Sequence, residues 1–215
     1  MMLRTFGMAV MLAAMTAPIA AAAAPQGGAA KPAVGSDTAL LVIDIQNFYF
    51  EGGLLPLTNP TEAAGQARRL LDAFRAKHLT VIHVQHVPQK VAIVDGVPSD
   101  PQYRIRPVVA PAPGEKVITK RFANSFRGTD LLEYLRAKGI KKLVIAGMQT
   151  QMCVEAAARA AADLGFDVTV VRDACTTHPL TFGGHTAPEI DVHTTALATI
   201  ANGRVVSTDE LLKEM

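Results

Sequence analysis

The sequence predicts one α/β domain whose mostly parallel sheet of six strands is covered by helices on both faces, a three-layer αβα arrangement. Short continuous apolar runs alternate with helical patterns along the chain, as in proteins built from strand–helix–strand units. The chain has 215 residues and a hydrophobic share of 49%, which suit one full core and argue against disorder. The formal net charge is only +2 and no basic stripe stands out, so we expect no nucleic-acid partner.

The first 24 residues have the pattern of a secretory signal peptide rather than that of a folded element. Arg4 precedes an apolar run at Phe6–Met15, and small residues follow at Ala20–Ala24. The run is shorter than the roughly 20 residues that span a bilayer, which favours cleavage over an uncleaved anchor. We therefore predict a signal peptide at 1–24, a flexible linker at 25–37, and a mature protein that is secreted or periplasmic and has no membrane partner.

The folded domain is expected at 38–215 and begins with a strand. The apolar run within Thr38–Asp44 is continuous, which is typical of a strand buried on both faces. A helix should follow, with Asn59 as its cap and Pro60 at its first position. Apolar residues then recur at helical spacing: Ala63, Ala67, Leu70, Leu71 and Phe74.

The middle of the domain adds two strands, a long irregular segment and a helix. Thr80–Val84 and Lys116–Thr119 are short stretches typical of strands. Between them, residues 88–114 are rich in proline and lack periodicity, and we expect at most a short hairpin around Asp95–Gly96. Thr129–Lys138 then fits a helix that a glycine ends.

The last third of the domain continues the alternation. In order, the expected elements are a strand at Lys142–Ala146, a helix at Met152–Leu164, a strand at Val168–Val171, a helix at Pro188–Asn202, a strand at Arg204–Ser207 and a final helix capped by Ser207 or Thr208. Such alternation gives parallel strands, and active sites in such sheets gather at the carboxyl ends of the strands. Reactive side chains at those ends should therefore share one site.

Three such side chains lie at or just beyond strand ends: Asp44, Lys120 and Cys153. Cys153 follows a strand and a glycine turn at the start of a helix, where N–H groups and the helix dipole favour a thiolate. Lys120 could supply a positive neighbour, and Asp44 could accept the thiol proton and return it to a leaving amine. Taken alone, each residue could have a purely structural role: Asp44 as an acidic loop residue, Lys120 as a solvated charge and Cys153 as a packing residue. Their convergence from three separate strands favours a shared catalytic site.

Four motifs, in this order, resemble those of the isochorismatase-like cysteine hydrolases, a family that includes nicotinamidases and N-carbamoyl amide hydrolases. They are Leu-Val-Ile-Asp-Ile-Gln-Asn at 41–47, Lys120 with Ala-Asn-Ser-Phe at 123–126, Gly-Met-Gln-Thr-Gln-Met-Cys-Val at 147–154, and Asp-Ala-Cys at 173–175. The resemblance covers nearly everything from Thr38 to Leu212. It implies the Rossmann-like fold of these hydrolases.

The resemblance also implies a catalytic triad. Cys153 would attack a carbonyl, Asp44 would shuttle the proton, and Lys120 would hold the carboxylate and help to keep the thiol ionised. The peptide bond before Gln149 would be cis, and the N–H groups of Gln149 and Cys153 would form an oxyanion hole. The expected substrate is a small amide or carbamoyl compound, cleaved through a thioester. Relatives of this kind usually assemble, so a homo-oligomer is expected.

The histidines depart from the pattern of the nicotinamidases, which carry an Asp-x-His metal motif after the second strand. This chain reads His-Val-Gln-His there, and His83 and His86 should point to opposite faces of a strand. We therefore expect no catalytic metal and no other cofactor, while a divalent ion on a histidine cluster is a narrower alternative. The other histidines of the mature chain are expected on the surface or in loops: His78, His178, His185 and His193.

The substrate pocket should be shaped by the loops at 88–114 and 176–188, which carry no recognisable specificity code. We expect the substrate to contact Phe48, Tyr49, Phe126 and His178, and His185 is a further candidate from the same loop as His178. Phe48 stands where many relatives carry aspartate. The substrates of those relatives therefore do not transfer to this chain.

A hypothesis from another functional class is a non-catalytic exported protein that binds a small molecule and carries a Cys153–Cys175 disulfide. Both cysteines follow strands that we expect to be neighbours, and an oxidising compartment would permit the bond. The number of free thiols separates the two hypotheses.

Overall fold

The computed structural model describes residues 34–200 and 203–215. The predicted signal peptide at 1–24 and most of the predicted linker lie outside these described residues. From residue 34 the chain leads through a turn into the first strand at Thr38. Within the described ranges, no helix is long and apolar enough to cross a membrane.

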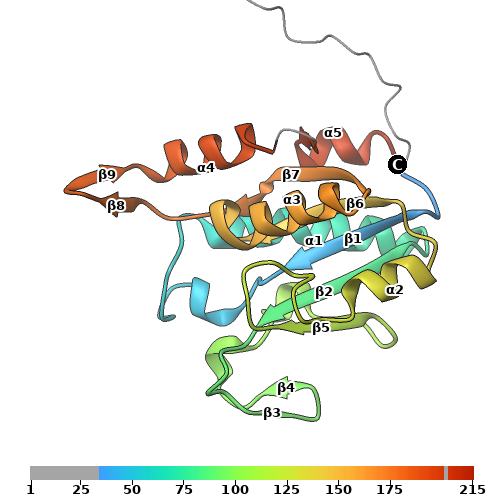
Figure 1. The fold of residues 1–215 in the computed structure, drawn as a ribbon, viewed down its shortest axis with the longest axis horizontal. Helices are drawn as coiled ribbons and strands as arrows, with labels where there is room; N and C mark the ends of the chain where they lie inside the picture. Colours follow the sequence, from blue (N-terminus) through green and yellow to red (C-terminus); the bar gives the residue numbers. More distant parts are fainter. Residues whose placement is uncertain (1–33, 201–202) are drawn as a thin grey trace, which may run out of the picture. The chain divides into compact units, whose positions relative to one another are not determined.

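A six-stranded sheet forms the centre of the described domain, in the order β10-β7-β6-β1-β2-β5 (Figure 1). Every pairing within it is parallel, which confirms the predicted sheet. β1 lies inside the sheet between β6 and β2, so the spatial order of the strands differs from their order in the chain. The strands are β1 (Thr38–Ile43), β2 (Thr80–His86), β5 (Lys116–Lys120), β6 (Lys142–Met148), β7 (Asp167–Thr176) and β10 (Gly203–Val206).

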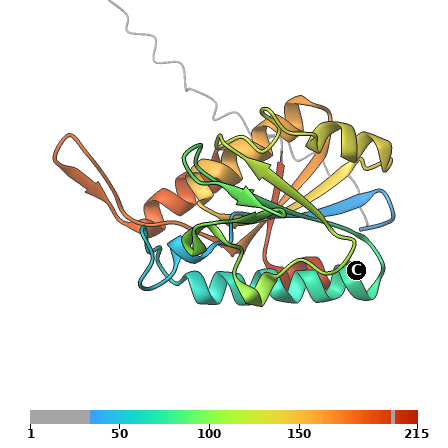
Figure 2. The same ribbon diagram turned by 90° about the horizontal axis from the view of Figure 1, so that it is seen from below.

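Helices cover both faces of this sheet, as Figure 2 shows. α1 (Pro60–Ala76) and α5 (Thr208–Leu212) lie on one face. α2 (Leu131–Ala137), α3 (Glu155–Asp163) and α4 (Glu189–Ala198) lie on the other. The predicted three-layer αβα arrangement is therefore confirmed.

β1 divides two hydrophobic cores because its side chains alternate between the faces of the sheet. Leu40 and Val42 belong to the core formed with α1. Ala39, Leu41 and Ile43 belong to the core formed with α2 and α3. Both faces are covered, so every position must be apolar, which explains the continuous apolar run in the sequence.

The segment between β2 and β5 has more local structure than its sequence suggests. The hairpin expected around Asp95–Gly96 is present as β3 (Ile93–Val94) and β4 (Val97–Pro98), paired antiparallel. Two short 3-10 helices follow at Pro101–Tyr103 and Pro107–Val109, each with proline at its first position. Proline suits the first turn of a helix because it lacks the N–H that would be unpaired there.

The segment between β7 and α4 was expected to be a loop, and this prediction was wrong in part. β7 runs to Thr176, beyond the expected end at Val171, and β8 (Leu180–Phe182) and β9 (His185–Ala187) then form an antiparallel hairpin. Gly183 and Gly184 form its turn with φ of 57° and 81°. A two-residue hairpin turn with positive φ at both positions favours glycine, so the Gly-Gly pair was a hairpin signal.

The helix ends agree only partly with the capping predictions. α1 begins at Pro60 as predicted, but Asn59 has a left-handed backbone (φ 46°) and its side chain makes no capping hydrogen bond. At α5, Ser207 rather than Thr208 is the cap. Its hydroxyl accepts a hydrogen bond from the Glu210 N–H, and the Glu210 carboxylate accepts one from the Ser207 N–H. This reciprocal pair stabilises a helix of only five residues.

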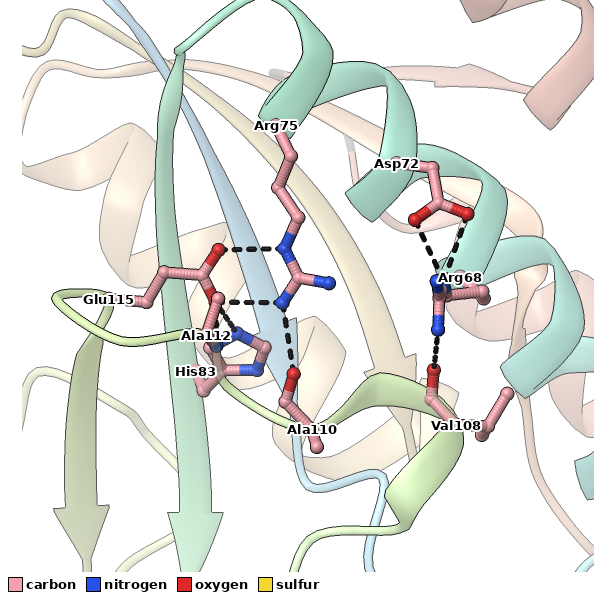
Figure 3. A network of polar contacts seen from close by, with 8 residues as sticks. All are labelled: Arg68, Asp72, Arg75, His83, Val108, Ala110, Ala112 and Glu115. Carbon is pink, nitrogen blue, oxygen red and sulfur yellow. Dashed lines mark hydrogen bonds and ion pairs between the residues drawn. The ribbon is translucent and has the colours of Figure 1, made fainter.

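A partly buried polar network attaches the segment before β5 to α1 and β2 (Figure 3). Arg75 on α1 donates from Nε and Nη2 to the two carboxylate oxygens of Glu115, at 2.8 Å each, and from Nη2 to the Ala110 carbonyl. Glu115 Oε2 also lies 2.8 Å from His83 Nε2 on β2 and accepts the Ala112 N–H. The Glu115 carboxylate is thus the point where three segments of the chain meet.

The same network sets the protonation of its members. Burial alone would raise the pKa of Glu115, but the hydrogen bonds from Arg75, Ala112 and His83 lower it to about 2. Burial lowers the pKa of His83 even though Glu115 favours its charged form. At neutral pH the network therefore holds an ionised Glu115 against Arg75 and a largely neutral His83.

Candidate active site

The structure brings the three predicted catalytic side chains together at the carboxyl edge of the sheet. Asp44 directly follows β1, Lys120 is the last residue of β5, and Cys153 follows β6. Lys120 Nζ lies 2.7 Å from Asp44 Oδ2 and donates a hydrogen bond to Cys153 Sγ at 3.1 Å. The side chains of Asp44 and Lys120 are both fully enclosed. One ammonium group thus contacts the acid and the thiol at once, and also donates to the Phe122 carbonyl.

The backbone at Asp44 leaves the strand in a conformation that is uncommon for a side-chain-bearing residue. Its φ is 52°, and its N–H still donates to the Val84 carbonyl of β2. Gln46, two residues on, is fully buried and fixes this turn to the end of β2. Its side chain accepts the His86 N–H at 2.8 Å and donates to the His86 carbonyl at 3.0 Å and to the Tyr103 carbonyl. Gln46 is a positioning residue whose role our sequence analysis missed, although it lies inside the first motif.

Gly147 allows β6 to lie against β1 immediately before the nucleophile. Its φ is 141°, and a Cβ at this position would lie 2.0 Å from the Ile43 carbonyl oxygen. Ile43 and Gly147 are direct partners in the sheet. After Gly147, the peptide bond between Met148 and Gln149 is cis, as the family resemblance implies.

Cys153 lies in a π-helical turn at Thr150–Val154, which precedes α3. The N–H groups of Met152 and Val154 both donate to the Gln149 carbonyl, at 3.1 and 3.2 Å. The predicted regular helix from Met152 is therefore wrong at its first turn. π-turns are frequent at functional sites, and this one places the Cys153 side chain at Lys120.

Side-chain hydrogen bonds hold the turn from its far side. Thr150 Oγ1 lies 2.9 Å from His193 Nδ1 on α4. Gln151 donates to Gln149 Oε1 at 2.8 Å and accepts from the Thr177 hydroxyl at 2.5 Å. The turn is thereby joined to α4 and to the end of β7.

The surroundings of Cys153 do not favour the anionic resting thiol that the sequence predicts. Burial and the negative charge of Asp44 raise the pKa of Cys153 to about 12, and the Lys120 ammonium only partly offsets them. Burial alone would lower the pKa of Lys120, but Asp44 and Cys153 raise it. The site therefore holds a neutral thiol beside a Lys–Asp ion pair.

The four predicted substrate contacts lie in different surroundings. Tyr49 is buried, and burial, followed by the nearby Asp44 charge, raises its pKa, which places a neutral phenol at the site. Phe48 packs against Tyr49 and Tyr103, with ring centroids 3.9 and 5.4 Å apart. Phe126 stacks on Phe166 and packs against the core cluster that includes Cys153, and His178 is half-buried just after β7.

The two histidines of β2 occupy separate environments, as their spacing predicted. His83 belongs to the Glu115 network, whereas His86 pairs with Lys120 in the sheet. Burial, and then the Lys120 charge, lower the pKa of His86. Its Nδ1 atom is buried and has no hydrogen-bond partner. His86 is thus a neutral side chain next to the site, which the sequence analysis considered only as a metal ligand.

Metal-binding and disulfide alternatives were also open from the sequence. Among residues 34–200 and 203–215, no three histidine, cysteine or carboxylate side chains form a group that could hold a metal ion. Cys153 and Cys175 are both buried free thiols. The disulfide of the non-catalytic alternative is therefore absent from this structure.

Two cavities of about 620 and 590 Å³ lie along α4 rather than at the triad. Part of the predicted pocket loop lines the larger one, through Leu180, Phe182, His185 and Ala187. Gln151 lines it as well and connects it to the turn that carries Cys153. The predicted roles of Gln149 and Cys153 N–H groups as an oxyanion hole stay a prediction.

Comparison with known proteins identifies relatives along nearly the whole domain. Residues 38–210 match the family model described as the isochorismatase domain. The uncharacterized isochorismatase family protein YddQ of Bacillus subtilis is 41% identical over 179 residues, which cover 82% of this chain and 99% of that protein. A crystal structure assigned to an isochorismatase hydrolase of Oleispira antarctica is similar with a TM-score of 0.77 at 42% identity, covering 84% of this chain and 98% of that chain.

A third relative has a named reaction. The ureidoacrylate amidohydrolase RutB of Rhizobium rhizogenes is 31% identical over 178 residues, which cover 67% of this chain and 72% of that protein. The family match includes the strands of the central sheet and the three side chains that meet at its edge. The chain therefore belongs to the isochorismatase family of hydrolases.

Proposed function

We propose that this protein is an exported cysteine hydrolase that cleaves a C–N bond of a small amide or carbamoyl compound through a thioester on Cys153. The observation that carries the proposal is the contact of Lys120 Nζ with both Asp44 and the Cys153 sulfur, at 2.7 and 3.1 Å. The resemblance to an amidohydrolase of the same family supports the class of bond. The proposed reaction requires a nucleophile, a group that carries a proton and a fixed positive charge. Cys153, Asp44 and Lys120 supply these in turn.

In the first step Cys153 Sγ attacks the carbonyl carbon while Asp44 accepts the thiol proton. The raised pKa of Cys153 means that the thiol is neutral at pH 7, so the proton must leave as the carbon–sulfur bond forms. Lys120 stays protonated because its pKa is raised, and it stabilises the negative charge that passes from Asp44 to the sulfur. Because the thiol starts neutral, the reaction needs a base, and the Asp44 carboxylate fills that role.

In the later steps the proton returns and water completes the reaction. The N–H groups of Gln149 and Cys153 would stabilise the carbonyl oxygen as it gains negative charge, and each such donor is typically worth about 2.7–4 kcal/mol. Asp44 then gives its proton to the departing nitrogen, which leaves a thioester. Asp44 next removes a proton from water as it attacks the thioester carbon, and Cys153 regains that proton when the acid product leaves.

Tyr49 is the predicted substrate contact that this site supports best. Its neutral phenol is enclosed near Asp44 and Cys153 and can donate a hydrogen bond to a substrate. Phe48 packs against the ring of Tyr49, so it would influence the substrate-binding site through Tyr49. A small planar substrate with a polar group beside the reacting carbonyl is the class that such a wall suits.

The proposal is tested by assaying the purified protein against a panel of amides, ureas and carbamates for released amine or ammonia. Cys153→Ala should lower turnover of the accepted substrate by at least about a thousandfold, because the nucleophile is lost. Cys175→Ala removes the other thiol and should stay within several-fold of the wild type. Mass spectrometry of a quenched reaction should find the acyl group on Cys153. Turnover in Cys153→Ala at the wild-type rate would refute the mechanism.

Export is the second part of the proposal. The family match begins at residue 38, so the leader-like segment with Arg4 and its apolar run precedes the matched domain. We expect the protein isolated from a periplasmic or culture fraction to begin near Ala22–Ala24 or shortly after. Intact mass determination measures this directly, and a mature chain that retains Met1 would rule out cleavage.

A further inference from the structure

A series of side-chain hydrogen bonds leads from the end of β7 into the turn that carries Cys153. The Thr177 hydroxyl donates to Gln151 Oε1 at 2.5 Å, and Gln151 Nε2 donates to Gln149 Oε1 at 2.8 Å. Thr177 is fully buried and Gln149 is 5% exposed. Buried polar groups are costly unless they are paired, so each member of this series depends on its neighbour.

The phenol of Tyr49 continues the series on the other side of Gln149. Burial, and then the charge of Asp44, raise the pKa of Tyr49, while a hydrogen bond from the Gln149 side chain acts in the opposite direction. A hydrogen bond that favours the ionised phenol comes from a donor. The donor of the Gln149 side chain is its Nε2 group, which therefore donates to the phenol oxygen of Tyr49.

Contacts outside this series hold Tyr49 beside the candidate active site. Its N–H donates to the carbonyl of Gln46 in the turn after β1, at 3.2 Å, and its carbonyl accepts the Leu57 N–H at 2.9 Å. Its ring packs on Phe48, with centroids 3.9 Å apart. Tyr49 also belongs to the same core cluster as Met148 at the end of β6. The phenol thus has a fixed place between the ends of β1 and β6.

Each bond in the series fixes the direction of the next. A side-chain amide that accepts a hydrogen bond at its oxygen presents its nitrogen in the other direction. The Thr177 hydroxyl therefore orients the amide of Gln151, which in turn orients the amide of Gln149. At the end of the series the phenol oxygen of Tyr49 is the acceptor, which leaves its O–H hydrogen to donate to another group.

The carboxylate of Asp44 does not take up this hydrogen. Within residues 34–200 and 203–215, Asp44 Oδ1 is buried and has no hydrogen-bond partner, and Oδ2 lies 2.7 Å from Lys120 Nζ. Tyr49 is nevertheless near enough for the charges of Asp44 and Cys153 to act on its pKa. Its O–H is therefore a donor beside the reacting groups that is available to a bound molecule.

We propose that Thr177, Gln151 and Gln149 form a relay that holds the Tyr49 hydroxyl as a donor to the substrate, so that the site prefers amides with a hydrogen-bond acceptor beside the scissile carbonyl. The inference rests on the proposed function, because it concerns the substrate of the same site. It narrows that function to compounds in which a second carbonyl or carboxylate oxygen lies next to the reacting amide. Tyr49 contacts the substrate, and the three relay residues position it.

The experiment compares the binding of two amides through their protection of Cys153 against alkylation by iodoacetamide, followed by mass spectrometry of the Cys153 peptide. Malonamide carries a second carbonyl, and 3-methylbutanamide has a similar size without that acceptor. The wild type should bind malonamide more tightly. Tyr49→Phe should weaken malonamide binding about three- to tenfold, the usual effect of losing one neutral hydrogen bond, and should leave 3-methylbutanamide binding unchanged.

The relay predicts the same change when its far end is removed. Thr177→Val keeps the shape of the side chain but lacks the hydroxyl, so it should also lower the preference for malonamide. Thr177→Ser retains the hydroxyl and should keep the preference. In the double variant Tyr49→Phe with Thr177→Val, the preference should fall no further than in Tyr49→Phe alone, because both changes act on one contact.

Thr176→Val is the matched control. Thr176 is the preceding residue and is also buried, but its hydroxyl donates to the Thr58 carbonyl rather than to Gln151. This variant therefore removes a hydroxyl from the same strand end without breaking the relay. The ratio of the two dissociation constants should equal that of the wild type.

Two results would overturn the proposal. One is a wild type that shows no preference for malonamide, including the case in which malonamide gives no protection. The other is a Thr177→Val variant that keeps the wild-type ratio or weakens the binding of both amides equally, as a purely structural role would. Protection requires binding but no turnover. The proposed function can therefore fail in the amide assay while this preference is found, and the preference can be absent from an active hydrolase.

Discussion

The ion pair between Asp44 and Lys120 is fully enclosed, and its stability alone does not explain its presence. Replacing a buried ion pair by apolar groups of similar volume is often neutral or stabilising. The Lys120 ammonium also donates to the Cys153 thiol, which a purely structural pair would not require. The charge at this position is therefore best explained by the chemistry of the thiol.

Removing only the positive partner should be costly for folding. Lys120→Met leaves the buried Asp44 carboxylate unpaired, and we expect a loss of about 3–5 kcal/mol in the free energy of unfolding. The double variant Lys120→Met with Asp44→Asn should recover most of that loss, although both proteins should be inactive. Urea unfolding of the two proteins at pH 7 measures the difference.

A control for this prediction is available on the same strand. Lys116 pairs with Asp130 at 2.5 Å, but both side chains are partly exposed, so Lys116→Met should cost at most about 1 kcal/mol. Equal losses in the Lys116 and Lys120 variants would contradict the assignment of a buried charge pair. So would a double variant that is no more stable than Lys120→Met.

At this scale the sequence predicted positions better than it predicted chemical states. The three predicted catalytic side chains could be brought to one place because parallel strands direct their ends to one edge of the sheet. The charge state of Cys153 could not, because it depends on how completely the site is enclosed and on the distance to Asp44. The places of His86 and Gln46 beside the site were missed for a related reason, since both depend on buried contacts between β2, β5 and the turn after β1.

At the scale of structural elements, the proline-rich segment before β5 is attached to its neighbours through one carboxylate, that of Glu115. Glu115 joins Arg75 of α1, His83 of β2 and the Ala112 N–H. Without this carboxylate the segment has fewer contacts that fix it to the sheet. The segment's placement should therefore respond to acid.

Glu115→Gln should lower the free energy of unfolding at pH 7 by about 1–2 kcal/mol, allowing for solvent screening. The pKa of Glu115 is lowered from 4.5 to about 2 by folding. Its contribution is therefore fully present above pH 4.5 and is lost as the pH falls toward 2. The gap between wild type and variant should close over that window in a series of chemical denaturations. Glu133→Gln, an exposed change on α2, serves as the control variant, and a constant gap between wild type and Glu115→Gln would contradict the prediction.

The elements that the sequence missed share a physical cause. The π-helical turn at Thr150–Val154 replaces the first turn of the expected helix, because local periodicity cannot distinguish an i+5 from an i+4 hydrogen bond. The β8–β9 hairpin was taken for a loop because its strands are three residues long and cover no core. The type and order of the strands of the central sheet and of the helices with a buried face were predicted correctly, since burial imposes a period on the sequence, although β7 extends past its predicted end.

For the whole molecule, the sheet could be predicted as parallel and covered on both faces, but its strand order could not. Alternation of strands and helices does not reveal that β1 lies between β6 and β2, since that depends on which crossover packs on which face. The consequence for the site is large. The acid comes from an inner strand and the lysine from the edge strand β5, and the long Lys120 side chain spans β2 to reach both partners.

Gly147 limits which substitutions the candidate site can accept. The backbones of β1 and β6 approach so closely at Gly147 that even a methyl group there would collide with Ile43. The residue after Ile43 carries the acid, and the turn that begins just after Gly147 carries the thiol. The distance between these two groups is therefore set where the backbones of β1 and β6 are in contact, and a larger residue at Gly147 would disturb it. Changes of specificity are free to accumulate in the surrounding loops, while the reacting pair keeps one fixed geometry.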